Sequence, residues 1–211
     1  MYILQGLIEN KLMRFSMDFE KLENVLYKKG LDAFATLFIS RPMDNFYSFG
    51  FYTTGEYNYA ATTASSYEGL EQVIKNYGYE KKPKESIEIK WSPVDSPIHS
   101  DSECCGIIGE VNDLLQDALK ESDEIYERDG LEGLGEFNAK VENAFVNALK
   151  RMDAKGVFGK GEQRKQVVVN LLKGDQSLEE RIYFAKMLNP PEAVEILTRD
   201  MDLDTYNLGK E

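Results

Sequence analysis

Histidine and cysteine are the scarcest reactive residues in this sequence. There is one histidine, His99, and the two cysteines stand side by side at Cys104 and Cys105. A zinc site with two or three histidines is therefore excluded, and adjacent cysteines cannot form a Cys-x-x-Cys pair. They also rarely bridge each other without strain, so we expect no disulfide framework and a reducing compartment. A Ser–His–Asp arrangement would depend on His99 alone, and no nucleophile-elbow pattern is present to hold its serine.

Long apolar runs are also missing. No segment approaches the roughly 18 consecutive apolar residues that a membrane span needs. Residues 1–16 have neither a continuous apolar stretch nor a small-residue cleavage site, so no signal peptide is predicted. We therefore expect a cytoplasmic protein that does not engage a membrane.

The sequence also lacks a surplus of basic residues, since it has 25 Lys and Arg residues and 37 Asp and Glu residues. The net charge of −12 repels nucleic acid and anionic membranes, which makes broad binding to either improbable. The negative charge is concentrated: thirteen carboxylates and only two basic residues, Lys120 and Arg128, lie between Asp95 and Glu136. Such a concentrated field steers a basic partner.

Apolar residues recur at helical spacing along much of the chain. The predicted helices cover residues 19–38, 67–77, 106–121, 134–152, 178–188 and 191–197. Ser65 with Glu68, and Ser177 with Glu180, are predicted capping boxes, and Gly78 is expected just past the end of its helix. Gly30 marks a place where the first helix is free to break.

Four segments have the composition or alternation of strands. Phe46–Thr53 and Tyr57–Thr63 are aromatic-rich or β-branched and are joined by a turn at Gly55, while 87–91 alternates with period two and 166–172 holds three consecutive valines. These patterns predict an α+β fold in which a small, mostly antiparallel sheet of about four strands packs against several helices.

The domain is expected to span residues 17–199, because the clean amphipathic pattern begins at Met17. Residues 1–16 are predicted to be an extension outside the fold, with either Met1 or Met17 as the native start. Residues 92–103, rich in Ser and Pro, are the candidate for an internal boundary, and residues 200–211 are expected to form a frayed tail.

The acidic region coincides with a predicted helix. At 100° per residue, four carboxylates fall within an arc of about 80° beside the apolar stripe. Three others lie further along as a rim. The predicted partner-binding residues are Glu110, Asp113, Asp117, Glu121, Asp123, Glu124 and Glu127. Like charges four residues apart destabilise a helix by about 0.2–0.5 kcal/mol per pair, which favours a functional interpretation. A solvated acidic face with no partner remains the plainer alternative.

Two other clusters have alternative interpretations. The first consists of Asp95, His99, Asp101 and Glu103, whose oxygen and imidazole ligands could together bind a divalent cation. The alternative is that these residues form a solvated polar loop. A basic group is formed by Lys150, Arg151, Lys155, Lys160, Arg164 and Lys165. It can touch phosphate, but cations at a helix C-terminus that complement the dipole are the preferred interpretation.

Several segments together resemble a known family. They are Asn45–Tyr52, Thr63–Leu70, Lys90–Pro93, Gly174-Asp175 and Leu188–Pro190. This pattern, which covers about Met17 to Leu197, is similar to a bacterial family of uncharacterised proteins known as domain of unknown function 4303. Where that family has an acidic or aromatic residue shortly after Trp-Ser-Pro, this chain has Asp95 and no second tryptophan. The family has no established catalytic residues, and its resemblance to proteins encoded beside secreted bacterial toxins implies an immunity role.

These lines of reasoning favour a non-enzymatic binding protein without a cofactor. Its expected partner is a basic protein, such as a toxin domain with a phosphate-binding cleft, engaged through the acidic helix. The alternative function is a cation-dependent hydrolase that uses the loop of residues 95–103.

Overall fold

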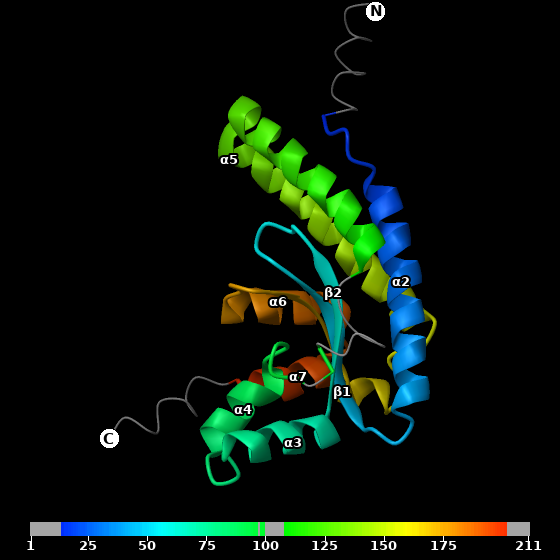
Figure 1. The fold of residues 1–211 in the computed structure, drawn as a ribbon, viewed down its shortest axis with the longest axis vertical. Coiled ribbons are helices and arrows are strands. Elements are labelled where there is room, and N and C mark those ends of the chain that lie inside the picture. Colours follow the sequence, from blue (N-terminus) through cyan, green and yellow to red (C-terminus); the bar gives the residue numbers. More distant parts are fainter. Residues whose placement is uncertain (1–13, 97, 100–107, 202–211) are drawn as a thin grey trace, which may run out of the picture.

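The computed structural model describes residues 14–96, 98–99 and 108–201. It is an α+β fold in which helices surround a small central sheet (Figure 1). In chain order the elements are α2 (Phe19–Ser40), β1 (Phe46–Thr53), β2 (Ala60–Ser66), α3 (Tyr67–Tyr77), α4 (Pro83–Trp91), α5 (Gly109–Ala154), the 3-10 helix η1 (Arg164–Gln166), β3 (Val168–Lys173), α6 (Leu178–Leu188) and α7 (Pro191–Asp200).

The described residues form a three-stranded sheet in the order β2-β1-β3. Strand β1 is antiparallel to β2 and parallel to β3. The expected α+β class is confirmed, but the sheet is mixed instead of mostly antiparallel, and it has one strand fewer than predicted. Gly50 lies in this central strand. A Cβ added there would lie 2.1 Å from the backbone carbonyl oxygen of Asn170, so only glycine fits the close approach of β1 to β3.

The prediction of a strand at residues 87–91 was wrong, because these residues belong to α4. Pro83 occupies the first turn of this helix, where its missing N–H is tolerated. Trp91 packs in an apolar cluster with Ile87 at its margin, whereas Ile89 faces a small cavity lined by α3. A short helix buried on two sides produces the same alternation of apolar and charged residues as a strand.

Apolar side chains fill both sides of the sheet. The larger cluster joins α2 and α5 to β1, and it includes the rings of Phe34, Phe49 and Phe158, whose centroids are 5.3–5.6 Å apart. Helix α2 continues through Gly30 without a break. A Cβ added at Gly30 would lie 3.0 Å from the side chains of Phe51 and Met152, so this glycine allows the helix to pack closely on the core.

Both outer edges of the sheet are covered. On β3, the side-chain amide of Asn189 accepts a hydrogen bond from the backbone N–H of Val169 and donates one to its carbonyl, at 2.7 and 2.6 Å. On β2, Ala60 donates to the Asn112 side chain and accepts from the backbone N–H of Ile108, both at 2.9 Å. At these positions the backbone groups are already paired and are not available for the addition of another strand.

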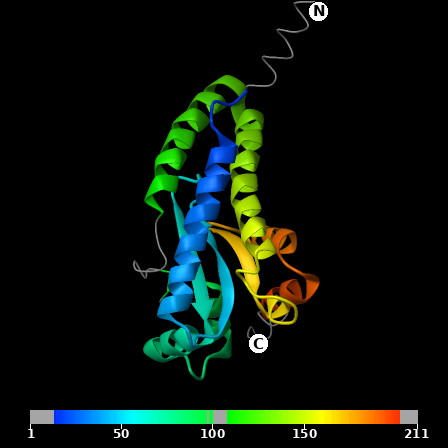
Figure 2. The same ribbon diagram turned by 90° about the vertical axis from the view of Figure 1, so that its right-hand side faces the viewer.

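Helix α5 is an antiparallel hairpin of two arms. The chain reverses at Gly130, whose φ of 66° and ψ of −157° suit only glycine. In Figure 2 the two arms run side by side with α2 against them, and the hairpin extends beyond the sheet. The two helices predicted at 106–121 and 134–152 correspond to these arms.

Two segments at predicted domain boundaries make contacts with the fold. Residues 1–13 and 202–211 lie outside the described residues, but Arg14 to Ser16 contact α5, so this part of the predicted extension packs on the fold. In the candidate boundary segment 92–103, Ile98 is fully buried and the Ser96 hydroxyl donates to the Ala64 carbonyl at 2.8 Å. That segment therefore packs against β2 where it is described. None of the described helices is long and apolar enough to span a membrane.

Candidate functional site

The first arm of α5, residues 109–129, is called the acidic arm here because it carries eight carboxylates and two basic residues. Its buried face consists of Val111, Leu115, Ala118 and Ile125. The carboxylates occupy the remaining surface, as the helical spacing predicted. The hairpin that carries this arm projects beyond the sheet (Figure 1).

Two of the four predicted stripe carboxylates interact with the N-terminal part of the chain. Glu110 forms an ion pair with Lys29 of α2 at 3.0 Å. Glu121 accepts hydrogen bonds from the backbone N–H and the hydroxyl of Ser16, the latter at 2.8 Å. These two side chains contact neighbouring segments, which the sequence did not reveal, although the exposed Glu110–Lys29 pair stabilises little.

The other carboxylates of the predicted site are exposed. Asp117 pairs with Lys120 on the same arm at 3.0 Å, but both side chains are about three-quarters exposed, so this pair stabilises little. Four carboxylates are exposed and make no hydrogen bond or ion pair with any described residue: Asp113, Asp123, Glu124 and Glu127. We call these four the open carboxylates. They are the part of the predicted site that remains available to a partner.

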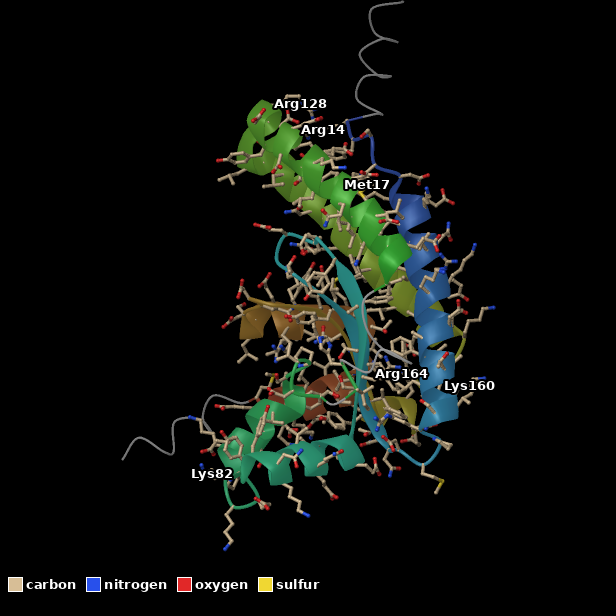
Figure 3. The ribbon with its side chains drawn as sticks, in the orientation of Figure 1. Arg14, Met17, Lys82, Arg128, Lys160 and Arg164 are labelled. Atoms are coloured by element: carbon tan, nitrogen blue, oxygen red, sulfur yellow. The ribbon has the colours of Figure 1, made fainter. Side chains whose placement is uncertain are left out.

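The hairpin tip carries a compact group of paired charges (Figure 3). Asp129 lies between Arg14 and Arg128, at 3.4 and 2.9 Å, and Arg14 also pairs with Glu136 on the second arm. The hydrogen bond from Arg128 and the nearby positive charges lower the pKa of Asp129 and keep it ionised. Both arginines at the tip are therefore paired, and Arg128 is also attracted by the nearby charges of Glu121 and Glu124.

Sequence reasoning missed two exposed apolar side chains beside this tip. Tyr126 is 54% exposed and Leu131 is 77% exposed, on either side of the turn at Gly130. In the sequence, Tyr126 has no apolar periodicity that marks it, and Leu131 falls between two helical patterns.

The predicted cation site is described only in part, because Asp101 and Glu103 lie outside the described residues. Asp95 accepts a hydrogen bond from the Tyr77 hydroxyl at 3.2 Å. His99 stacks edge-to-face on Tyr52 with centroids 5.0 Å apart, and burial lowers its pKa. Within the described ranges, no group of three or more His, Cys, Asp or Glu side chains is arranged to hold a metal ion.

The predicted basic group does not form one surface. Arg164 is buried, and its guanidinium donates to Asp153 and to the carbonyls of Val167 and Leu188 at 2.6–2.8 Å. It therefore joins the end of α5 to β3 and α6. Arg151 pairs with Glu23 of α2, and Lys165 pairs with Glu162 and Glu192. The exposed cations Lys150, Lys155 and Lys160 remain, and Figure 3 shows Lys160 far from the hairpin tip.

A partly buried polar cluster lies at the carboxyl ends of the parallel strands β1 and β3. The Lys173 ammonium lies 3.2 Å from Glu142, 2.9 Å from Glu180 and 3.3 Å from the Tyr57 hydroxyl, which donates to Glu142. Burial and the contact with Glu142 raise the pKa of Tyr57, so its phenol stays neutral. Burial alone would lower the pKa of Lys173, but the hydrogen bonds and attraction of the two carboxylates outweigh this and raise it. The lysine therefore remains a cation, as in a structural ion pair, and is a poor nucleophile.

Three of the segments that carry the family resemblance meet in space. The Asn45 backbone and side chain both donate to Glu68, at 2.8 and 2.6 Å. The Lys90 ammonium lies within 6 Å of several rings and pairs with Asp200 at 2.6 Å. Those rings belong to Tyr47, Tyr67 and Trp91. This contact joins β1, α3, α4 and α7, so the shared residues serve packing at this point.

Comparison with protein families matches residues 26–190 to DUF4303, a domain of unknown function. No curated protein and no solved structure matches the chain. The match covers most of the sequence, including the sheet, the hairpin and α6, and it agrees with the segments that suggested the resemblance. The chain therefore belongs to the DUF4303 family.

Proposed function

We propose that this protein binds a basic protein partner through the acidic arm and has no catalytic activity of its own. The observation that carries the proposal is the set of open carboxylates, which are exposed and unpaired on a helix that projects beyond the sheet. A helix with a purely structural role would gain stability from interleaved lysines, whereas this arm accepts repulsion between neighbouring carboxylates.

Electrostatic attraction would act mainly on the rate of encounter. Complementary charges raise association rates by about 10–1,000-fold at low salt, and charge pairs strengthen when the interface excludes water. We infer that the partner is a toxin domain whose basic surface binds phosphate, which makes this chain an immunity protein of the cytoplasm. Two properties support that partner class: the surplus of exposed carboxylates and the resemblance to proteins encoded beside toxins.

The test begins with capture of partners from the source organism on immobilised protein at about 0.05 M salt, where screening is weak. A variant then replaces Asp113 and Asp123 with Asn, and Glu124 and Glu127 with Gln. The matched control makes the same change of charge at exposed positions elsewhere: Glu56→Gln, Glu71→Gln, Glu80→Gln and Glu88→Gln.

Association of the captured basic protein is measured by stopped-flow mixing across a range of salt concentrations. We expect the variant to associate about tenfold more slowly at low salt and to lose its salt dependence, while the control stays close to the wild-type rate. Equal rates for the variant and the control would contradict the proposal, and so would the absence of any basic protein retained at low salt.

A cation-dependent hydrolase based on the 95–103 loop is the second candidate. The Nδ1 atom of His99 is buried and has no hydrogen-bond partner among the described residues, which favours a ligand at this point. Calorimetric titration with magnesium, manganese, calcium and zinc tests it. A heat of binding that His99→Gln abolishes supports this function, and no heat with any of the four cations removes it.

A further inference from the structure

We propose that Tyr126 and Leu131 form the apolar anchor of the partner interface, and that the partner places apolar side chains at the centre of a Lys- and Arg-rich surface. This inference rests on the proposed function, because it specifies where the basic partner docks. The two residues flank the turn of the hairpin, and exposed carboxylates lie close to both of them along the chain. We call this pair the tip anchor.

The exposure of Tyr126 is not explained by contacts within the protein. Other exposed tyrosines interact with neighbours: Tyr67 stacks on Tyr47, Tyr77 donates to Asp95, and Tyr183 packs against Phe184. Tyr126 makes no hydrogen bond and no ring contact with any described residue. Its ring therefore presents a large, rigid surface to solvent.

Leu131 is exposed for a different reason. It directly follows Gly130, where the chain leaves helical geometry, so its side chain projects from the turn instead of lying between the arms. A polar residue would serve equally well at an exposed position that makes no packing contact. An isolated exposed leucine needs no explanation, but one beside an exposed tyrosine at the end of a projecting hairpin extends the apolar surface.

The charges around the tip anchor determine the chemistry of the partner. Asp123 and Glu127 lie within one helical turn of Tyr126, and Glu132 follows Leu131; all three are exposed. Arg128, the nearest cation along the chain, is paired with Asp129. Binding sites of high affinity commonly combine an aromatic centre with a polar rim that excludes water. An acidic rim around an apolar centre fits a basic rim around an apolar recess, and it repels an anionic lipid surface.

The distribution of apolar surface elsewhere supports this choice. Ile39 and Met43 are even more exposed, at 80% and 85%, but they lie at the end of α2 and in the loop after it, where the neighbouring carboxylate, Asp44, is paired with Arg41. They supply a matched control, since their replacement removes exposed apolar surface without touching the hairpin.

Two synthetic peptides serve as probes of the acidic arm. One repeats lysine and leucine so that a helix would have one basic and one apolar face, and the other has the same length and charge with serine in place of leucine. Binding is measured by fluorescence anisotropy for the wild type, for Tyr126→Ser/Leu131→Ser and for the control Ile39→Ser/Met43→Ser. Circular dichroism verifies that all three proteins are folded.

We expect the wild type to bind the leucine peptide about tenfold more tightly than the serine peptide, a preference typical of an apolar anchor. That preference should disappear in Tyr126→Ser/Leu131→Ser and persist in the control. If the tip variant keeps the preference, or if the wild type has none, the tip anchor is refuted while salt-dependent binding of both peptides still supports the proposed function. If neither peptide binds in a salt-dependent manner, the proposed function and the tip anchor both fail.

Discussion

Among the described glycines, Gly50 has the most restricted environment. A Cβ at this position would lie 2.1 Å from the Asn170 carbonyl oxygen, and that atom belongs to the backbone of the neighbouring strand. Because a backbone cannot rotate away as a flexible side chain can, Gly50→Ala should force β1 and β3 apart. We expect a loss of about 1–3 kcal/mol in the free energy of unfolding, measured by urea denaturation.

The control for this prediction is Gly55→Ala in the turn between β1 and β2. No atom lies within 4 Å of a Cβ added at Gly55, so its free energy of unfolding should change by less than about 0.5 kcal/mol. Equal stability of the two variants would show that the strands do not approach as closely as described.

Local signals predicted most of the helix ends that they addressed. The capping box of Ser177 and Glu180 is confirmed, and so is Gly78 with its left-handed conformation. The first capping box was wrong by one residue: Ser66 caps α3, while Glu68 binds Asn45 across the chain. Short-range patterns indicate which residue types begin a helix. They did not distinguish Ser65 from Ser66, because Glu68 accepts hydrogen bonds from the distant Asn45.

At the scale of elements, the contact between Arg14–Ser16 and the hairpin has a measurable consequence. Phe15 stacks edge-to-face on Phe137 with centroids 5.4 Å apart and packs at the margin of the main core. A chain that begins at Met17 lacks this ring and the contacts of Arg14 and Ser16 with α5. We expect its free energy of unfolding to be about 1–3 kcal/mol lower than that of a chain that begins at Arg14.

Hydrogen exchange separates this effect from general destabilisation. The amides near the hairpin turn should lose protection first in the shorter chain, whereas the amides of β1 and β3 should follow global stability. Equal stability of the two chains would show that residues 14–16 contribute nothing to the fold.

Element types were largely predictable, but their partners were not. The two helical patterns of α5 gave its arms correctly, and Gln166–Leu172 largely matched β3. The parallel pairing of β1 with β3 could not be derived, because more than a hundred residues separate the strands and neither carries a signal for its neighbour. For the same reason the sequence placed Glu110 in the stripe without showing that Lys29 of α2 would lie beside it.

At the scale of the whole molecule, the concentration of charge in the acidic arm should lower stability. Asp113 lies four residues before Asp117, and Asp123 lies four residues before Glu127, so each pair repels along the helix. Replacing Asp113, Asp123 and Glu127 with their amides removes both repulsions. At low salt we expect the free energy of unfolding to rise by about 0.4–1 kcal/mol, from about 0.2–0.5 kcal/mol for each pair.

Salt distinguishes this effect from other consequences of the substitutions. Added salt screens repulsion between exposed charges, so the wild type should gain stability between low and high salt while the variant gains less. The control Glu56→Gln, Glu71→Gln and Glu80→Gln changes the net charge equally, but Lys75 follows Glu71 by four positions in α3, and Glu56 and Glu80 lie outside the helices. It should gain no stability at low salt. If the control is stabilised as much as the variant, the destabilising repulsion comes from the net charge of −12 of the whole chain. The charge pattern of the acidic arm would then cause no loss of stability of its own.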